Sequence, residues 1–238
     1  MERFKRTVSL IGEDAFNKLN NAKVIIFGLG GVGSYIAEAL VRSGVRKLAV
    51  CDGDTVSESN INRQLIALNS TVGRRKTEVF GERAKDINPS VWVIEYPLFY
   101  SAETEQEIDL SVYDYIIDAV DTVTAKILII KNAVKCGKPV ISCMGTGNKL
   151  NPNAFKVADI SKTAYCPLAR VVRRELSKIG ITKGVKVLYS EEMPVKPIGD
   201  ENSDIKGSGI APASIAFVPS VAGLIIAGEV VKDLTEKV

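Results

Sequence analysis

A chain of 238 residues can bury a substantial core, and its 46% hydrophobic and 25% charged residues are ordinary for a globular protein. The 31 lysines and arginines exceed the 28 acidic residues by only three, so bulk charge does not indicate a nucleic-acid partner. Histidine is absent, which excludes a Ser-His-Asp triad, a histidine base and histidine metal ligands. The four cysteines form no C-x-x-C pair, so we expect reduced, cytoplasmic thiols and no zinc knuckle.

The predicted elements begin with a mobile or docked arm and a short helix over 14–21. The basic N-terminus is not followed by an unbroken apolar run, so we expect no signal peptide. A strand over 24–27 then leads through closely spaced glycines into a helix that ends at Gly44, and a second strand over 45–51 stops at an acid. This order is typical of a nucleotide site.

Helical and strand patterns continue to alternate through the first half of the chain. They predict a helix that residues 71–76 open and that runs to residue 88, followed by strands over 91–96 and 114–119. A helix closed by Gly137 and a strand over 139–144 come next. Strands separated by helices favour right-handed crossovers, with ligands beyond the carboxyl ends of the strands. We therefore expect an α/β fold with a Rossmann-like, mostly parallel sheet and helices on both faces, extended by additional strands in the C-terminal half.

The second half is less regular. Strands over 154–160 and 185–189 flank a basic helix over 167–178, and residues 191–212 predict a long exposed loop. A strand over 214–218 is expected to return to the sheet.

The stretch between Lys206 and Glu229 has no charged residue, which raises the question of a membrane span. Prolines and glycines divide it, however, so we expect a turn, a strand and a helix from Ser220 that is buried in the core or in a dimer interface, and no membrane partner.

The glycine turn defines the chemistry of the first strand's end. Gly28, Gly30 and Gly33 let the backbone approach a phosphate, and Asp52 is placed to hold a ribose hydroxyl. A nicotinamide or flavin dinucleotide would require the same pattern, and tight helix packing alone also demands glycine. The turn by itself leaves these alternatives open.

The following polar residues favour a triphosphate. Asn60, Arg63 and Lys76 lie where they can fold back over the nucleotide and neutralise charge during attack on the α-phosphorus. Taken singly, each is better explained as a solvated surface residue. Asp121 follows the strand over 114–119, where it would hold Mg²⁺ or cap the next helix.

The motifs GLGGVGS, DGDTVSESNINRQ, VGRRK and DAVDT together resemble the adenylation domain of the ubiquitin-activating-enzyme superfamily. The resemblance implies one adenylation-type domain over 1–238, with an ATP-binding half (1–150) and a substrate- and dimer-facing half (151–238). It implies catalytic roles for Arg63, Lys76 and Asp121, and for Arg6 supplied by the neighbouring protomer of a homodimer. The implied nucleotide contacts are Gly28, Gly30, Gly31, Gly33, Asp52, Asp54, Asn60, Arg63, Gln64, Lys76 and Asp121, with Asp121 on Mg²⁺.

In the second half, VADISKT, PLAR, VLYSEE and FVPS resemble the tRNA threonylcarbamoyladenosine dehydratase family. This implies ATP-dependent dehydration and cyclisation of N6-threonylcarbamoyladenosine at position 37 of tRNA, through activation of the threonyl carboxylate. The resemblance also permits a monovalent cation, Na⁺ or K⁺, and a sulfur-relay protein. The alternatives are adenylation of the C-terminal glycine of a sulfur-carrier protein, whose usual zinc cysteines are absent here, and a catalytically silent nucleotide-binding adaptor.

Basic residues crowd around the helix over 167–178 and predict a surface for tRNA phosphates, although a solvated helix face would explain them equally well. They are Arg170, Arg173, Arg174, Lys178, Lys183 and Lys186.

Cys166 lies at the start of the same helix, a position at which some enzymes place a reactive thiol. The family motif that this segment resembles has Asp-Pro-Leu at this place, and intramolecular ring closure needs no thioester. We therefore expect Cys166 to be inert.

Overall fold

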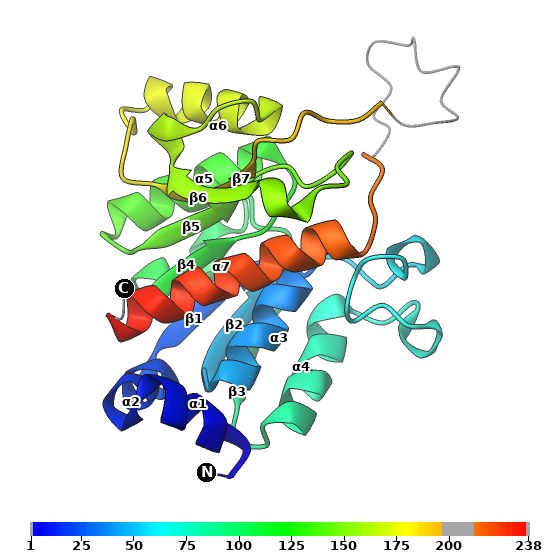
Figure 1. Ribbon diagram of the computed structural model, residues 1–238, viewed down its shortest axis with the longest axis vertical. Coiled ribbons are helices and arrows are strands. Elements are labelled where there is room, and N and C mark those ends of the chain that lie inside the picture. Colours follow the sequence, from blue (N-terminus) through cyan, green and yellow to red (C-terminus); the bar gives the residue numbers. More distant parts are fainter. Residues whose placement is uncertain (1, 197–211, 237–238) are drawn as a thin grey trace.

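The protein, described here by a computed structural model over residues 2–196 and 212–236, is built on one seven-stranded sheet (Figure 1). The strand order is β3-β2-β1-β4-β5-β7-β6, and every pairing is parallel except that of β6 with β7. The strands are β1 (Lys23–Phe27), β2 (Lys47–Cys51), β3 (Trp92–Tyr96), β4 (Tyr115–Asp118), β5 (Val140–Cys143), β6 (Phe155–Asp159) and β7 (Lys186–Ser190). The predicted mostly parallel sheet, extended by strands from the second half, is confirmed.

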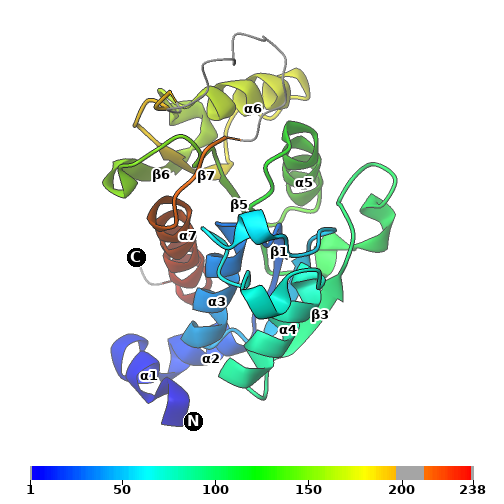
Figure 2. The same cartoon turned by 90° about the vertical axis from the view of Figure 1, so that its right-hand side faces the viewer.

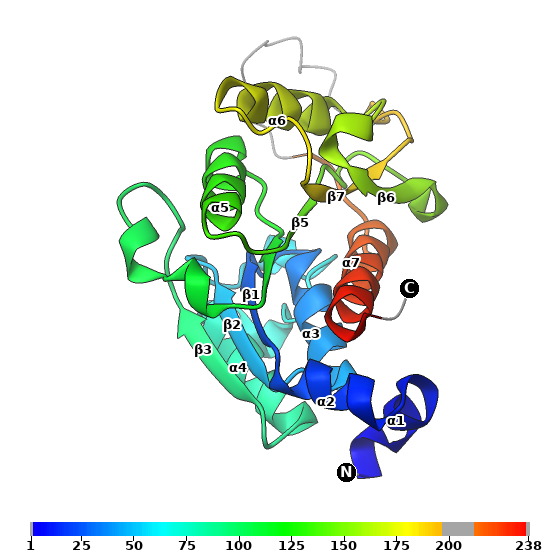
Figure 3. The same cartoon turned by 90° about the vertical axis from the view of Figure 1, so that its left-hand side faces the viewer.

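Helices cover both faces of the sheet, as predicted (Figures 2 and 3). On one face lie α3 (Gly33–Ser43), α4 (Lys76–Ile87) and α7 (Phe217–Thr235), and on the other lie α5 (Val123–Lys135) and α6 (Pro167–Lys178). The short 3-10 turns are Glu2–Phe4, Glu58–Asn60, Asn69–Thr71, Glu105–Glu107, Leu110–Val112, Pro152–Ala154 and Ile160–Lys162.

Alternation along β1 shows how the sequence makes two cores. Val24 and Ile26 pack with α3 and α7, whereas Ile25 and Phe27 pack with α5 and α6, and all four are fully buried. Because successive side chains of a strand point to opposite faces, a continuous apolar run fits only a strand covered on both sides. Between α3 and α4, Glu38 accepts hydrogen bonds from Arg83 and Arg42.

The predicted N-terminal arm is helical and docked. Helix α1 (Lys5–Ile11) precedes α2 (Glu13–Asn21), the Phe4 and Phe16 rings lie 5.4 Å apart, and Arg3 Nη1 donates to the Ile87 carbonyl at 2.6 Å. Since β1 begins two residues after α2 ends, both helices lie near the amino-terminal edge of the sheet (Figure 1).

The end of the chain corrects one prediction. Residues 214–216 belong to no strand and α7 begins at Phe217, so the strand expected over 214–218 is wrong. Pro219 fits the first turn of α7, where its missing N–H is not needed. Most of the loop predicted over 191–212 lies outside the described residues.

Helix α7 is the buried helix that the charge-free stretch predicts. It buries Val218, Ala222, Ile226 and Val230 beside α3, while Leu224 on its outer face is 51% exposed. Within the described ranges, no helix is long and apolar enough to cross a membrane.

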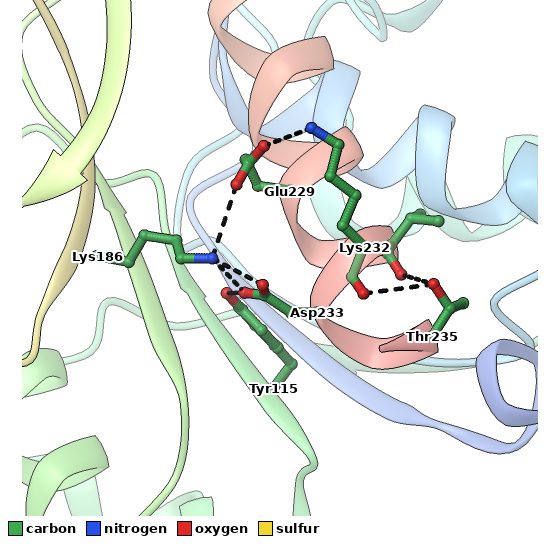
Figure 4. A network of polar contacts seen from close by, with 7 residues as sticks. Tyr115, Lys186, Glu229, Lys232, Asp233 and Thr235 are labelled. Atoms are coloured by element: carbon green, nitrogen blue, oxygen red, sulfur yellow. Dashed lines mark hydrogen bonds and ion pairs between the residues drawn. The ribbon is translucent and has the colours of Figure 1, made fainter. Parts of the chain in front are cut away.

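A polar network ties the last turns of α7 to the sheet (Figure 4). Lys186 of β7 donates to both carboxylate oxygens of Asp233 at 2.7 Å, and its Nζ lies 3.7 Å from Glu229. The Tyr115 hydroxyl of β4 donates to Asp233 at 2.6 Å. This network joins α7 to the amino-terminal ends of β4 and β7.

Candidate active site

A cavity of about 720 Å³ opens at the carboxyl edge of the sheet. Residues that directly follow β1, β2, β4 and β5 form its walls, as the parallel order requires. The predicted nucleotide contacts that line it are Gly28, Gly30, Gly31, Asp52, Asp54, Asn60, Arg63, Gln64, Lys76 and Asp121.

Gly33 and Gly28 serve the packing of the turn. Gly28 has a φ of 89°, and a Cβ on it would lie 2.7 Å from the Ala119 carbonyl oxygen. A Cβ on Gly33, which is not among the cavity's lining residues, would lie 1.8 Å from the Gly28 carbonyl oxygen. Tight packing therefore explains Gly33, whereas Gly30 and Gly31 form the cavity wall itself.

Asp52 holds the glycine turn against the end of β2. Its Oδ2 accepts the Leu29 N–H at 2.6 Å, and its Oδ1 accepts the Asp54 N–H at 2.9 Å. With only 8% of its side chain exposed, Asp52 is a fixed acceptor at the cavity wall.

Lys76, the first residue of α4, places a buried cation between two carboxylates. Its side chain is 5% exposed, and its Nζ lies 2.9 Å from Asp54 Oδ2 and 3.7 Å from Asp52 Oδ1. Asp54 is 54% exposed, so this partner is shared with solvent. The ammonium group of Lys76 is therefore held in place by these carboxylates, while its nearest partner stays accessible to solvent.

The loop after β2 supplies further polar groups. Arg63 Nη1 donates to the Ser59 carbonyl at 2.9 Å and to Asn62 Oδ1 at 2.8 Å, which fixes one side of its guanidinium. Gln64 is 7% exposed, and its Oε1 is buried without a hydrogen-bond partner among the described residues. A buried amide oxygen without a partner is an acceptor that a bound ligand would satisfy.

Asp121, which follows β4, is exposed and lines the same cavity. Helix α5 has Thr122 as its N-cap, with no side-chain capping hydrogen bond, so Asp121 does not act as the helix cap. Its carboxylate is available to the cavity.

Sequence reasoning missed a buried ion pair directly behind this wall. Lys126 Nζ lies 3.1 Å and 3.2 Å from the two Asp118 carboxylate oxygens and donates to the Cys143 carbonyl at 2.6 Å. Asp118 also accepts hydrogen bonds from Ser142 Oγ and from the Val120 N–H, and both charged residues are fully buried. Lys126 precedes the buried Ile129 and Ile130 by three and four residues, a spacing that could have revealed it.

The basic residues around α6 are not equivalent. Arg173 Nη1 donates to the carbonyl and hydroxyl of Thr163, and Lys186 is bound to Asp233 at the other edge of the sheet. Arg174 and Lys178 both pair with Glu175. The side chains of Arg170 and Lys183 make no hydrogen bond or ion pair with the described part of the chain, and both are exposed.

Two further groups singled out in the sequence, Arg6 and Cys166, are not among the residues that line the cavity, whereas one cysteine that was not singled out does line it. Arg6 is exposed on α1, near the amino-terminal edge. Cys166 is 4% exposed and is the N-cap of α6. Cys143 lines the cavity, but burial raises the pKa of its thiol to about 12, so it is a poor nucleophile at neutral pH.

The model of the ThiF family matches residues 4–237. The chain belongs to the ThiF family. It is 46% identical over 246 aligned residues to the tRNA threonylcarbamoyladenosine dehydratase of Bacillus subtilis, covering all of this chain and 96% of that relative. The match extends through the second half, which places this ThiF-family chain with the dehydratases of that name.

Solved structures agree with this placement. The Escherichia coli tRNA N6-threonylcarbamoyladenosine dehydratase in complex with AMP superposes with a TM-score of 0.90 at 31% identity, over 99% of this chain and 95% of that one. The same enzyme in complex with ATP gives a TM-score of 0.88 at 30% identity, with the same coverage. The resemblance to the dehydratase family and the α/β fold are therefore confirmed.

Proposed function

We propose that this chain uses ATP to dehydrate and cyclise threonylcarbamoyladenosine in tRNA. The observation that supports it best is the convergence of the glycine turn, Asp52, Lys76 and Asp121 on one cavity. That cavity lies in a chain which matches a dehydratase over its whole length.

The chemistry requires activation of a carboxylate. Attack of the threonyl carboxylate on the α-phosphorus of ATP releases pyrophosphate and forms an acyl adenylate. The substrate's own carbamoyl group then attacks the acyl carbon and gives up a proton, the ring closes, and AMP leaves with the former carboxylate oxygen, so that the nucleoside loses one water overall. Because nucleophile and electrophile are tethered, positioning supplies most of the acceleration, and a chain without histidine suffices.

We assign the nucleotide contacts by charge. Lys76 and Arg63 would neutralise the phosphates, and Asp52 would accept a ribose hydroxyl beside the glycine turn. Gln64 Oε1, the unpartnered acceptor, would take a hydrogen bond from the nucleotide or the substrate. Asp54 and Asn60 complete the same wall.

Asp121 fits a magnesium site in which one carboxylate and the phosphate oxygens of the nucleotide bind the ion. Among the described residues, no group of three or more Cys, Asp and Glu side chains could hold a metal ion. Mg²⁺ prefers one or two carboxylates together with phosphate oxygens, so a single exposed carboxylate on the cavity wall is a fitting ligand. Bound there, Mg²⁺ would reduce the negative charge of the triphosphate. The monovalent cation and the sulfur-relay protein stay predictions.

Arg6 could act in the proposed reaction only at the cavity of a second copy of the chain. It lies near the amino-terminal edge of its own sheet, whereas the cavity lies at the carboxyl edge. A homodimer that lends Arg6 in trans is testable by mixing Arg6→Ala and Lys76→Ala chains. Each mixed dimer would regain one intact site, so about a quarter of wild-type activity should return. No recovery from chains that do exchange would contradict the arrangement.

For tRNA contact we retain Arg170, Lys183, Arg174 and Lys178, which are exposed around α6. Arg173 and Lys186 are bound within the protein and are weaker candidates. A tRNA substrate also supports a cytoplasmic location.

The test is incubation with ATP, Mg²⁺ and threonylcarbamoylated tRNA, followed by mass spectrometry of the nucleoside. We expect loss of one water from the nucleoside and one AMP per event. Lys76→Ala should lower the rate roughly 100-fold or more, whereas Lys85→Ala, exposed on the same helix, should not. No loss of water with the wild-type protein would refute the function, and pyrophosphate exchange that depends on a sulfur-carrier protein would favour the alternative.

A further inference from the structure

Tyr165 has an unusual backbone conformation. Its φ is 62°, and among the described residues only Asn148 and Glu236 are other non-glycine residues with positive φ. The Cys166 N–H donates to the Ala164 carbonyl at 2.7 Å, which closes a three-residue γ-turn around Tyr165. A γ-turn with positive φ at its centre is rare and strained for a bulky residue.

The structure holds both ends of this turn. On one side, Thr163 is buried and accepts two hydrogen bonds from Arg173 Nη1. On the other, Cys166 is buried, and its carbonyl accepts the Arg170 N–H of α6 at 3.1 Å. Strain persists only where surrounding contacts impose it, and such positions cluster at functional sites.

The turn presents the ring of Tyr165 instead of burying it. The residue is 63% exposed, and its hydroxyl makes no hydrogen bond with the described residues. Glycine would adopt this backbone at lower cost. The aromatic ring is therefore not explained by packing or by the turn.

Tyr165 lies close in the chain to a residue of the cavity wall and to an exposed cation. Leu168, three residues further on, lines the cavity. Arg170, in the first turns of α6, is exposed and has no side-chain partner in the described ranges. Proteins recognise single-stranded RNA by stacking unpaired bases on exposed aromatic rings, with cations on the backbone phosphates.

We propose that Tyr165 stacks on a base next to the modified adenosine of the tRNA, while Arg170 contacts a neighbouring phosphate. This inference rests on the proposed function. It makes Tyr165 a positioning residue that acts on tRNA and not on ATP.

Three substitutions separate recognition from folding. Tyr165→Gly removes the ring and relieves the backbone strain, Tyr165→Ala removes the ring and keeps the strain, and Tyr165→Phe keeps the ring. We expect the KM for tRNA to rise roughly 5- to 100-fold in the Gly and Ala variants and to stay near wild type in the Phe variant. The KM for ATP should not change, and Tyr165→Gly should be at least as stable as wild type. Trp92→Ala, which removes another exposed ring at the opposite edge of the sheet, should leave both constants unchanged.

A binding measurement provides an independent readout. A tRNA with 2-aminopurine next to the modified adenosine should lose fluorescence on binding wild type and Tyr165→Phe, but not Tyr165→Gly. Wild-type KM and quenching in Tyr165→Gly would refute the stacking, even where turnover by wild type supports the proposed function. No turnover by wild type would refute that function, and the fluorescence measurement would still decide whether Tyr165 stacks.

Discussion

Replacing Lys126 by methionine tests whether the ion pair behind the cavity holds its walls. Methionine has a similar length and no charge, so the change removes the cation with little change in volume. Asp118 would then be a fully buried carboxylate without a counter-ion, and the Cys143 carbonyl would lose its 2.6 Å donor. Both groups adjoin residues that line the cavity.

The expected cost follows from this enclosure. Removing one partner of a buried ion pair costs about 3–5 kcal/mol, because the remaining charge stays buried and uncompensated. In a chain of this size, each kcal/mol lowers Tm by about 2–4 °C, so Tm should fall by about 6–20 °C. The affinity for ATP should fall with it, since Val120 and Cys143 form part of the cavity wall.

Thermal or urea denaturation measures the loss, and calorimetry measures ATP binding. Lys131→Met, on the exposed side of the same helix, is the matched control and should cost less than about 0.5 kcal/mol. The double variant Lys126→Met with Asp118→Asn should recover at least half of the loss, because no buried charge remains. A loss below about 1 kcal/mol, or a double variant no more stable than the single one, would refute the reasoning.

Three further predictions concern the turn, a surface ion pair and the thiols. Gly33→Ala should abolish ATP binding by calorimetry, because its Cβ would lie 1.8 Å from the Gly28 carbonyl oxygen; an unchanged Kd would contradict this. Burial alone would raise the pKa of Glu38, but hydrogen bonds from two arginines outweigh it and lower the pKa. Glu38→Gln should therefore destabilise the protein at pH 7. This difference should shrink as the pH falls below the ordinary glutamate pKa of about 4.3 and be lost once the pH is below the lowered pKa of Glu38 in the folded protein; an equal loss at neutral and acid pH would be inconsistent with it. Iodoacetamide at neutral pH should modify the exposed Cys136 and spare Cys143, whose thiol pKa is raised to about 12, as peptide mapping would reveal.

The fold was predictable where apolar patterns alternate with turns, which covers most of the chain up to Ser190. Helix α1 escaped prediction because it buries none of its residues, so no apolar stripe marks it. The strand expected over 214–218 failed for another reason. Its apolar residues suit a strand locally, but β6 and β7 already complete that part of the sheet, and only the tertiary structure reveals this.

The site residues were predictable where their positions follow from the order of the strands. Residues at the ends of parallel strands necessarily converge, so Asp52 and Asp121 could be assigned to one cavity from the sequence. The partners of a long side chain are not local. Lys186 was grouped with α6 by its sequence position, yet it points to Asp233, 47 residues further along the chain.

Two buried lysines near the cavity differ in what surrounds them, and this difference separates their proposed roles. Lys126 is enclosed by the fully buried Asp118 carboxylate and the Cys143 carbonyl, so moving it would leave a buried charge without compensation. Lys76 is also buried and lies 3.7 Å from the buried Asp52 carboxylate, but its nearest partner, Asp54, is 54% exposed, so water can replace the lysine there at little cost. A phosphate entering the cavity therefore competes for Lys76 and not for Lys126. This is why we propose Lys76 for the nucleotide and assign Lys126 to the wall that holds it.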